Sequence, residues 1–151
     1  LLQQNLTLLH LLSKVQNLLS TLLKFDRLFE ICLIKYPNEP IVKQAAYFIL
    51  TDCYHFYTFI SNHIIIMIEE IFNLPSDEAL FLYEIYAENI QATRTLKKFM
   101  EFRTLIKEFE IKEPQYYPID AELNKNVELF IIGLKSRNQL ERSKRWSSKN
   151  L

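Results

Sequence analysis

The sequence predicts an all-α protein whose four main helices pack as an antiparallel stack or bundle, and three observations lead to this fold class. Along most of the chain, apolar residues recur at intervals of three and four, which is the spacing of one helical face. The chain has one glycine in 151 residues, so the tight turns of β-hairpins, which need positive φ, have almost no suitable site. Apolar residues make up 49% of the chain and aromatic residues 13%, which is enough for the core of one domain.

The first predicted helix covers residues 1–36. Its apolar stripe consists of Leu8, Leu11, Leu12, Val15, Leu18, Leu19, Leu22 and Leu23. Pro37 and Pro40 should end this helix, because proline lacks an amide proton and biases the preceding residue away from helical geometry.

The second predicted helix follows this proline pair. Its apolar ladder runs from Val42 to Phe72 and keeps one register for about eight turns. The polar and proline-containing stretch 73–76 breaks the ladder, so a second long helix should end there.

The third predicted helix begins at Ser76, whose side chain is expected to cap it. Asp77 and Glu78 then occupy the first turn, where the helix dipole favours negative charge. The stripe of this helix runs from Ala79 to Met100, and the helix is expected to end near Phe109.

The fourth predicted helix is shorter. Pro114 and Pro118 bracket an extended connection, Asp120 can cap the helix, and the helix is expected to end at about Gly133. Because short connections leave consecutive helices nearly antiparallel, the four apolar stripes should close on one another.

Residues 1–134 are expected to form the folded part and residues 135–151 a basic, disordered linker. Within the linker six basic residues stand against one acid. These basic residues are Lys135, Arg137, Arg142, Lys144, Arg145 and Lys149. They could meet an anionic surface, although a solvated linker into a longer protein is the favoured interpretation. Because Leu1 is neither an initiator methionine nor part of a basic leader, the chain is expected to be a fragment.

Residue spacing predicts no catalytic, metal or cofactor site. His10, His55 and His63 are not spaced as a metal clamp, and the cysteines form no Cys-x-x-Cys pair. Cys32 and Cys53 lie in apolar stretches and are expected to be reduced core residues. Phosphate-cradling loops need several glycines, so nucleotide binding is not expected either. The sequence therefore predicts a protein that is not an enzyme.

The charge pattern also argues against nucleic acid and against a membrane span. Lys plus Arg and Asp plus Glu both number 18, so the strong positive field of a nucleic-acid binder is missing. The uncharged stretch 53–68 is too short and too polar to cross a bilayer.

The centre of the chain carries two adjoining motifs that resemble those of a known family. Residues 52–75 read DCYHFYTFISNHIIIMIEEIFNLP, and residues 76–86 read SDEALFLYEIY. The first motif resembles the long helix of the ANTH domain of clathrin-assembly endocytic adaptors, and the second resembles the opening of the next helix of that domain. The leucine pattern of residues 11–23 and the connection at Tyr117-Pro118 are similar too, so the resemblance covers residues 6–132. His63 stands where the family has glycine and Glu70 where it has lysine, so the chain resembles a divergent member. The regions around Pro75 and Pro118 resemble the plant-type clathrin-assembly proteins in particular.

The resemblance implies the carboxy-terminal half of an ANTH α-solenoid in an adaptor of clathrin-mediated endocytosis and coated-vesicle budding. In the family, a groove between neighbouring long helices receives the amphipathic helix of a vesicle SNARE, and Ile68 and Thr93 fall where that groove is lined. Phosphoinositide binding is implied for helices missing from this chain, and clathrin and adaptor binding for the parent protein. The implied location is cytoplasmic and peripheral, at the plasma membrane, at clathrin-coated pits and vesicles, or at the Golgi.

Two alternatives stay open at this point. The first is a helical-repeat scaffold for protein interaction, which stacked and equivalent helix pairs would favour. The second is a membrane-surface module that uses the basic segment between Lys135 and Lys149, which a helix with one apolar face in that segment would favour.

Overall fold

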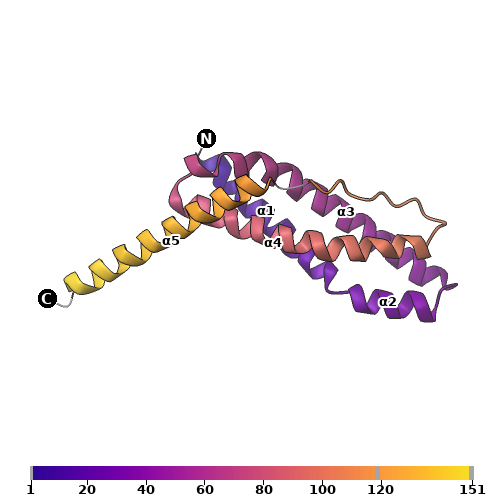
Figure 1. Ribbon diagram of the computed structural model, residues 1–151. Helices are drawn as coiled ribbons and strands as arrows, with labels where there is room; N and C mark the ends of the chain where they lie inside the picture. Colours follow the sequence, from indigo (N-terminus) through magenta and orange to yellow (C-terminus); the bar gives the residue numbers. More distant parts are fainter. Residues whose placement is uncertain (1, 118–119, 150–151) are drawn as a thin grey trace.

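The computed structural model describes residues 2–117 and 120–149, and within these ranges the chain is helical without a strand. The elements are α1 (Leu2–Leu23), α2 (Asp26–Lys35), α3 (Pro40–Glu69), the 3-10 turn η1 (Ile71–Asn73), α4 (Ser76–Met100), the 3-10 turn η2 (Glu101–Leu105) and α5 (Ala121–Lys149). The predicted all-α class is confirmed. The four predicted helices are all present, with the first in two pieces (Figure 1).

The predicted first helix breaks at Lys24 and Phe25, where the amide groups bond three residues back instead of four. A straight continuation would place Arg27 and Glu30 in line with the buried Leu23, since they follow it by one and two helical turns. The break turns Phe29 and Leu33 inward instead. The break therefore keeps charge out of the core.

Helices α1, α3 and α4 form the body of the molecule, and each packs against the other two. Figure 1 shows α3 and α4 running side by side along most of their length, with α2 beyond one end of α1. The side chains at the centre of the body are fully enclosed, among them Leu12, Leu50, Ile60, Leu82 and Leu96. This core fixes the relative position of the two long helices.

The stripe predicted for α1 is partly wrong. Leu11 and Leu18 are exposed, whereas Leu9, outside the predicted stripe, is fully buried. Gln16 also faces inward, between Leu12 and Leu19 on the same face, and its buried position could not be expected from apolar spacing. The buried face of α1 thus has a polar centre.

Some helix ends are formed as the sequence predicts, and others are not. Pro40 is in the first turn of α3, where its missing amide proton costs nothing. Asp120 caps α5 as predicted, since its Oδ1 accepts a hydrogen bond from the Leu123 amide at 2.8 Å. The cap predicted from Ser76 is not formed, because Ser76 is the first helical residue and makes no side-chain cap bond.

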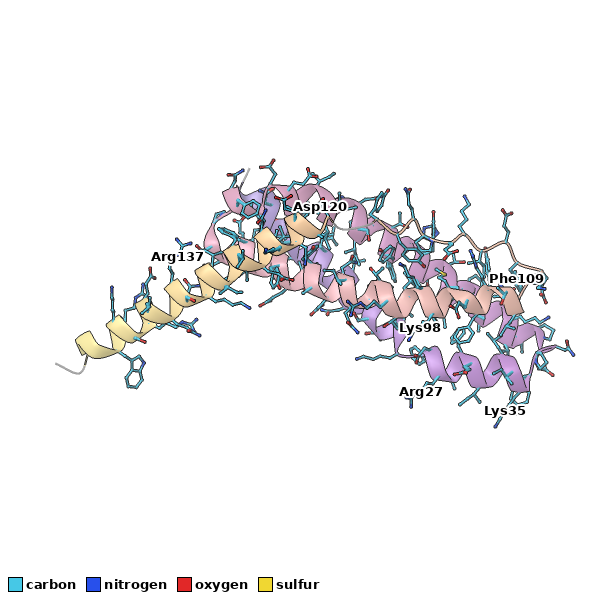
Figure 2. All side chains as sticks on the ribbon, viewed as in Figure 1. Arg27, Lys35, Lys98, Phe109, Asp120 and Arg137 are labelled. Carbon is cyan, nitrogen blue, oxygen red and sulfur yellow. The ribbon has the colours of Figure 1, made fainter. Side chains whose placement is uncertain are left out.

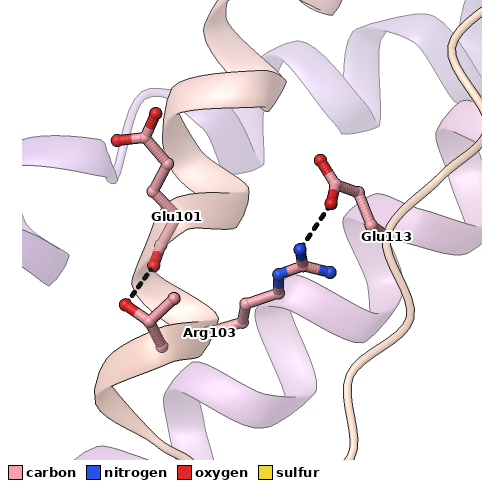
Figure 3. Close-up of polar contacts among 4 residues, drawn as sticks. Glu101, Arg103 and Glu113 are labelled. Atoms are coloured by element: carbon pink, nitrogen blue, oxygen red, sulfur yellow. Dashed lines mark hydrogen bonds and ion pairs between the residues drawn. The ribbon is translucent and has the colours of Figure 1, made fainter.

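The end predicted for α4 near Phe109 is also wrong, since the helix ends at Met100 and the chain turns back through η2. The turn buries Ile106, while Arg103 is only half-buried. From there a non-helical segment, residues 106–117, returns along α3 (Figure 1). Lys43 of α3 pairs with Glu108 near the start of this segment, and Arg103 of η2 pairs with Glu113 in its second half (Figure 3).

Helix α5 runs to Lys149, so the end predicted at Gly133 is wrong, and the segment after it is helical instead of irregular. Gly133 has no positive φ, and nothing in its surroundings lies within 4 Å of the place that a Cβ would take. A glycine with helical geometry costs a helix about 1 kcal/mol relative to alanine, and the good helix formers that follow it offset this. The predicted connection at Pro118 lies outside the described residues.

Candidate partner-helix groove between α3 and α4

A cavity of about 320 Å³ lies between α3, α4 and the start of α5. Its aliphatic lining comes mainly from α3 and consists of Ile64, Ile65 and Ile68 of α3, Ile90 of α4 and Leu123 of α5. Exposed charged side chains, Glu69, Arg94 and Asp120, stand among its lining residues. An apolar slot with a polar rim is the form in which helices are received by grooves.

Both residues named from the family resemblance line this cavity. Ile68 approaches it from α3 and Thr93 from α4, so the fold brings together two positions that lie 25 residues apart. Ile68 is only 5% exposed and is also part of the core, whereas Thr93 is half-buried. Of the two, Thr93 is the more accessible to a partner.

A chain of polar side chains surrounds Thr93. Its hydroxyl donates to the Asn89 carbonyl at 2.8 Å and lies within hydrogen-bond distance of the Tyr57 hydroxyl, at 3.1 Å. The buried Asn89 side chain donates from Nδ2 to Oε1 of Gln16 at 3.4 Å, and Nε2 of Gln16 donates to Oγ of Ser20 at 3.3 Å. This network links α1, α3 and α4 and gives the cavity a polar floor.

Ser61 adds an unpaired group to that floor. It lines the cavity and is 5% exposed, and its Oγ has no hydrogen-bond partner in the described part of the chain. A buried hydroxyl without a partner costs about 1–3 kcal/mol, so a ligand atom that reaches it is favoured. Sequence reasoning passed over Ser61 and Asn89 as site residues, although a polar residue inside each apolar ladder was the available signal.

The start of α5 closes one side of the cavity. Tyr86 of α4 donates a hydrogen bond from its hydroxyl to Oδ1 of Asn124 at 2.8 Å, which fixes the first turn of α5 against α4. Burial, together with the nearby Glu128 carboxylate, raises the pKa of Tyr86 to about 12, so the phenol remains a donor at neutral pH. The shape of the groove therefore depends on a neutral hydrogen bond.

A second cavity, of about 550 Å³, lies between the outer face of α3 and the returning segment, and both His55 and His63 line it. His63 Nδ1 lies 2.7 Å from the Phe59 carbonyl, one turn earlier. No cluster of three or more His, Cys, Asp or Glu side chains that could hold a metal occurs within residues 2–117 and 120–149. Burial raises the pKa of the Cys53 thiol to about 12, with Asp52 adding to the shift, so this thiol is not reactive at neutral pH.

The basic residues that were assigned to the carboxy-terminal segment lie along the second half of α5. Lys135 lies over the ring of Tyr83, with its Nζ 5.8 Å from the ring centre. Arg137, Arg142, Lys144 and Arg145 are exposed, and the side chain of Lys149 is outside the described residues. Among the helices described, none has the length and apolar character needed to cross a membrane.

Comparison with known proteins places the chain in a family. The family model of the ANTH domain matches residues 2–118, a range that contains both walls of the groove and stops before α5. Comparisons with curated proteins and with solved structures give no significant match. On the strength of the family match, the chain belongs to the ANTH domain family, the all-α domain family of endocytic, clathrin-assembly adaptors.

Proposed function

We propose that this chain is the carboxy-terminal helical part of an ANTH domain, within an adaptor that acts in clathrin-mediated endocytosis and coated-vesicle budding. Membership of the family supports the adaptor role. The Lys-rich and His-Tyr motif with which the resembled family holds a phosphoinositide headgroup has no counterpart in these 151 residues. Headgroup selectivity, clathrin binding and adaptor binding are therefore assigned to other parts of the protein, which would act at the cytoplasmic face of the plasma membrane or the Golgi.

The partner proposed for this part of the domain is the amphipathic helix of a vesicle SNARE, which would bind in the groove between α3 and α4. One observation carries this proposal, namely the cavity in which Ile68 and Thr93 meet. A cavity of about 320 Å³ cannot hold a helix but can hold one or two of its side chains. The helix would thus lie along the groove and insert anchors at intervals of three and four residues.

The polar floor of the cavity favours one kind of anchor side chain on the partner helix. A fully apolar side chain would leave Ser61 Oγ without a partner, whereas a side chain with an amide or hydroxyl group could bond to it. We therefore expect the preferred helix to carry one such polar residue among its apolar anchors. Thr93 also offers less apolar surface than the methionine-like residue that the resembled family has at this position. This difference should weaken the binding free energy by about 1 kcal/mol.

Titration with a purified SNARE-helix peptide tests the groove. Ile65→Ser and Ile90→Ser change half-buried lining residues and should each weaken binding about tenfold or more, because each removes buried apolar area. Ile66→Ser is the matched control, since Ile66 is exposed and does not line the cavity. Thr93→Met should strengthen binding.

Circular dichroism of each variant separates lost binding from lost fold. Equal binding by the Ile65, Ile66 and Ile90 variants, at unchanged helicity, would show that the groove is not the binding site of the peptide.

A separate sedimentation assay tests the assignment of lipid selectivity. Vesicles that contain phosphatidylinositol bisphosphate should bind this chain no better than phosphatidylserine vesicles of equal charge, and a clear preference would contradict the assignment.

A further inference from the structure

The second half of α5 leaves the body of the molecule. Leu134 is the last buried residue in the described part of the chain, and after the half-buried Asn138 the side chains up to Trp146 are all exposed. Figures 1 and 2 show this half of the helix pointing away from α3 and α4, with its side chains spread into solvent. A helix of this length has little stability by itself in water, so a surface that covers it would stabilise it.

Charge is strongly segregated into the same segment. Residues 135–149 contain six basic residues and one acid and so carry +5, and because the whole chain is neutral, the remaining residues carry −5. Basic side chains occupy both flanks of the helix, with Arg137 and Lys144 two turns apart on one flank and Lys135 and Arg142 two turns apart on the other. The complementary partner is therefore anionic.

Between these flanks lies a stripe without charge, which we call the outer stripe. It comprises Leu129, Ile132, Ser136, Leu140 and Ser143, at intervals of three and four residues, and the basic flanks border its second half, from Ser136 onward. Its leucines and isoleucine are exposed, Leu140 at 62%, and Trp146 at the edge of the stripe is 75% exposed. Apolar side chains with a basic border on either side are the pattern of helices that lie in a membrane interface.

The two serines do not oppose burial of this stripe. The hydroxyl of Ser136 donates to the Ile132 carbonyl at 3.0 Å, and that of Ser143 donates to the Gln139 carbonyl at 3.0 Å. Because the helix itself satisfies both hydroxyls, the stripe can leave water without an unpaired donor.

We propose that residues 135–149 of α5 lie on an anionic lipid surface, with Leu140 and Trp146 among the headgroups and the flanking basic side chains beside the phosphates. This contact is independent of the SNARE groove, which lies on α3 and α4. A membrane explains the exposed leucine and tryptophan together with the charge, whereas nucleic acid would account for the charge alone. Selectivity would follow total negative charge and not a particular headgroup.

Trp146 is the only tryptophan of the chain and therefore reports directly on this contact. Its fluorescence is recorded while the whole chain is titrated with phosphatidylcholine vesicles that contain or lack phosphatidylserine. We expect a blue shift and saturable binding with the anionic vesicles only. Double-stranded DNA at the same ionic strength is the competing partner, and tighter binding to DNA than to anionic vesicles would overturn the proposal.

Two matched pairs of variants sharpen the test. Replacing Arg137, Arg142 and Lys144 together by Glu should weaken vesicle binding at least about a hundredfold, since each lost positive charge lowers the affinity about fivefold. Reversing Lys14 of α1, Lys24 in the break after α1 and Arg27 of α2 to Glu changes the net charge equally, and it should have much less effect. Leu140→Ser should weaken binding about tenfold, whereas Leu18→Ser, at an exposed leucine of α1, should not.

Equal losses in the two charge-reversal variants, or no blue shift with anionic vesicles, would overturn the proposal. Sedimentation with the same vesicles measures binding independently of the tryptophan. Helicity measured for each variant without vesicles shows that the fold of the body is retained.

Discussion

Helices α3 and α5 have almost the same length, 30 and 29 residues, but very different surroundings. α3 packs against α1, α4 and the returning segment, and its buried residues run from Ala46 to Ile68. α5 contacts the body through its first half, where Val127, Ile131 and Leu134 are buried. A long helix therefore need not imply a long core, because helix-forming residues can extend a helix beyond its last packed turn.

The largest expected effect contrasts two leucines, one in the body and one in the second half of α5. Leu82→Ala empties a fully enclosed site and should lower the free energy of unfolding by about 2–5 kcal/mol. Leu140→Ala removes no packed side chain and should change it by less than about 0.5 kcal/mol. Urea unfolding of both variants measures the difference, and similar losses would mean that the end of α5 is packed in solution.

A smaller effect is expected from the polar centre of the body. Asn89→Ala removes the partner of Gln16 Oε1, a buried acceptor, and should cost about 1–3 kcal/mol. Replacing Gln16 and Asn89 together by leucine removes both polar groups and should recover much of that loss. If the double variant is less stable than Asn89→Ala, the two side chains do not act as a pair.

The next effect concerns the junction between the packed and projecting parts of α5. Gly133→Ala adds a methyl group to a helical position with free space around it, so α5 should gain about 0.5–1 kcal/mol of local stability. Hydrogen exchange should slow in residues 134–146 and stay unchanged in α3. Faster exchange in α5 would show that this glycine has a non-helical role.

The stability of the body is also expected to depend on pH, and this dependence is weakest near neutral pH. The raised pKa of Cys53 means that the folded protein keeps this proton where the unfolded chain loses it, so stability should fall as the pH rises from about 9 toward 12. The half-buried Tyr116, whose hydroxyl is enclosed and whose pKa is also raised, acts in the same direction. Urea midpoints at about pH 8 and pH 10 measure the fall, and Cys53→Ala should make it less steep. A stability that rises with pH would contradict the burial of this thiol.

Apolar spacing could predict the helices of the body because their stripes are long and regular. It could not predict the break at Lys24 and Phe25, since neither glycine nor proline marks it and the cause is the position of Arg27 and Glu30 relative to the core. It also missed the length of α5, because a glycine indicates a helix end unless the helix propensity of the residues after it is considered. At the groove, the resemblance found Ile68 and Thr93, but the polar floor depends on which helical faces meet.

Hydrogen exchange of the whole chain, measured with each ligand in turn, locates both proposed contacts in one experiment. The SNARE-helix peptide should protect the parts of α3 and α4 that line the groove, within residues 57–69 and 86–94, and leave residues 135–149 unchanged. Anionic vesicles should do the reverse. Two separate footprints are the predicted result, whereas no protection of the groove at saturating peptide would contradict the proposed adaptor role of this part of the domain.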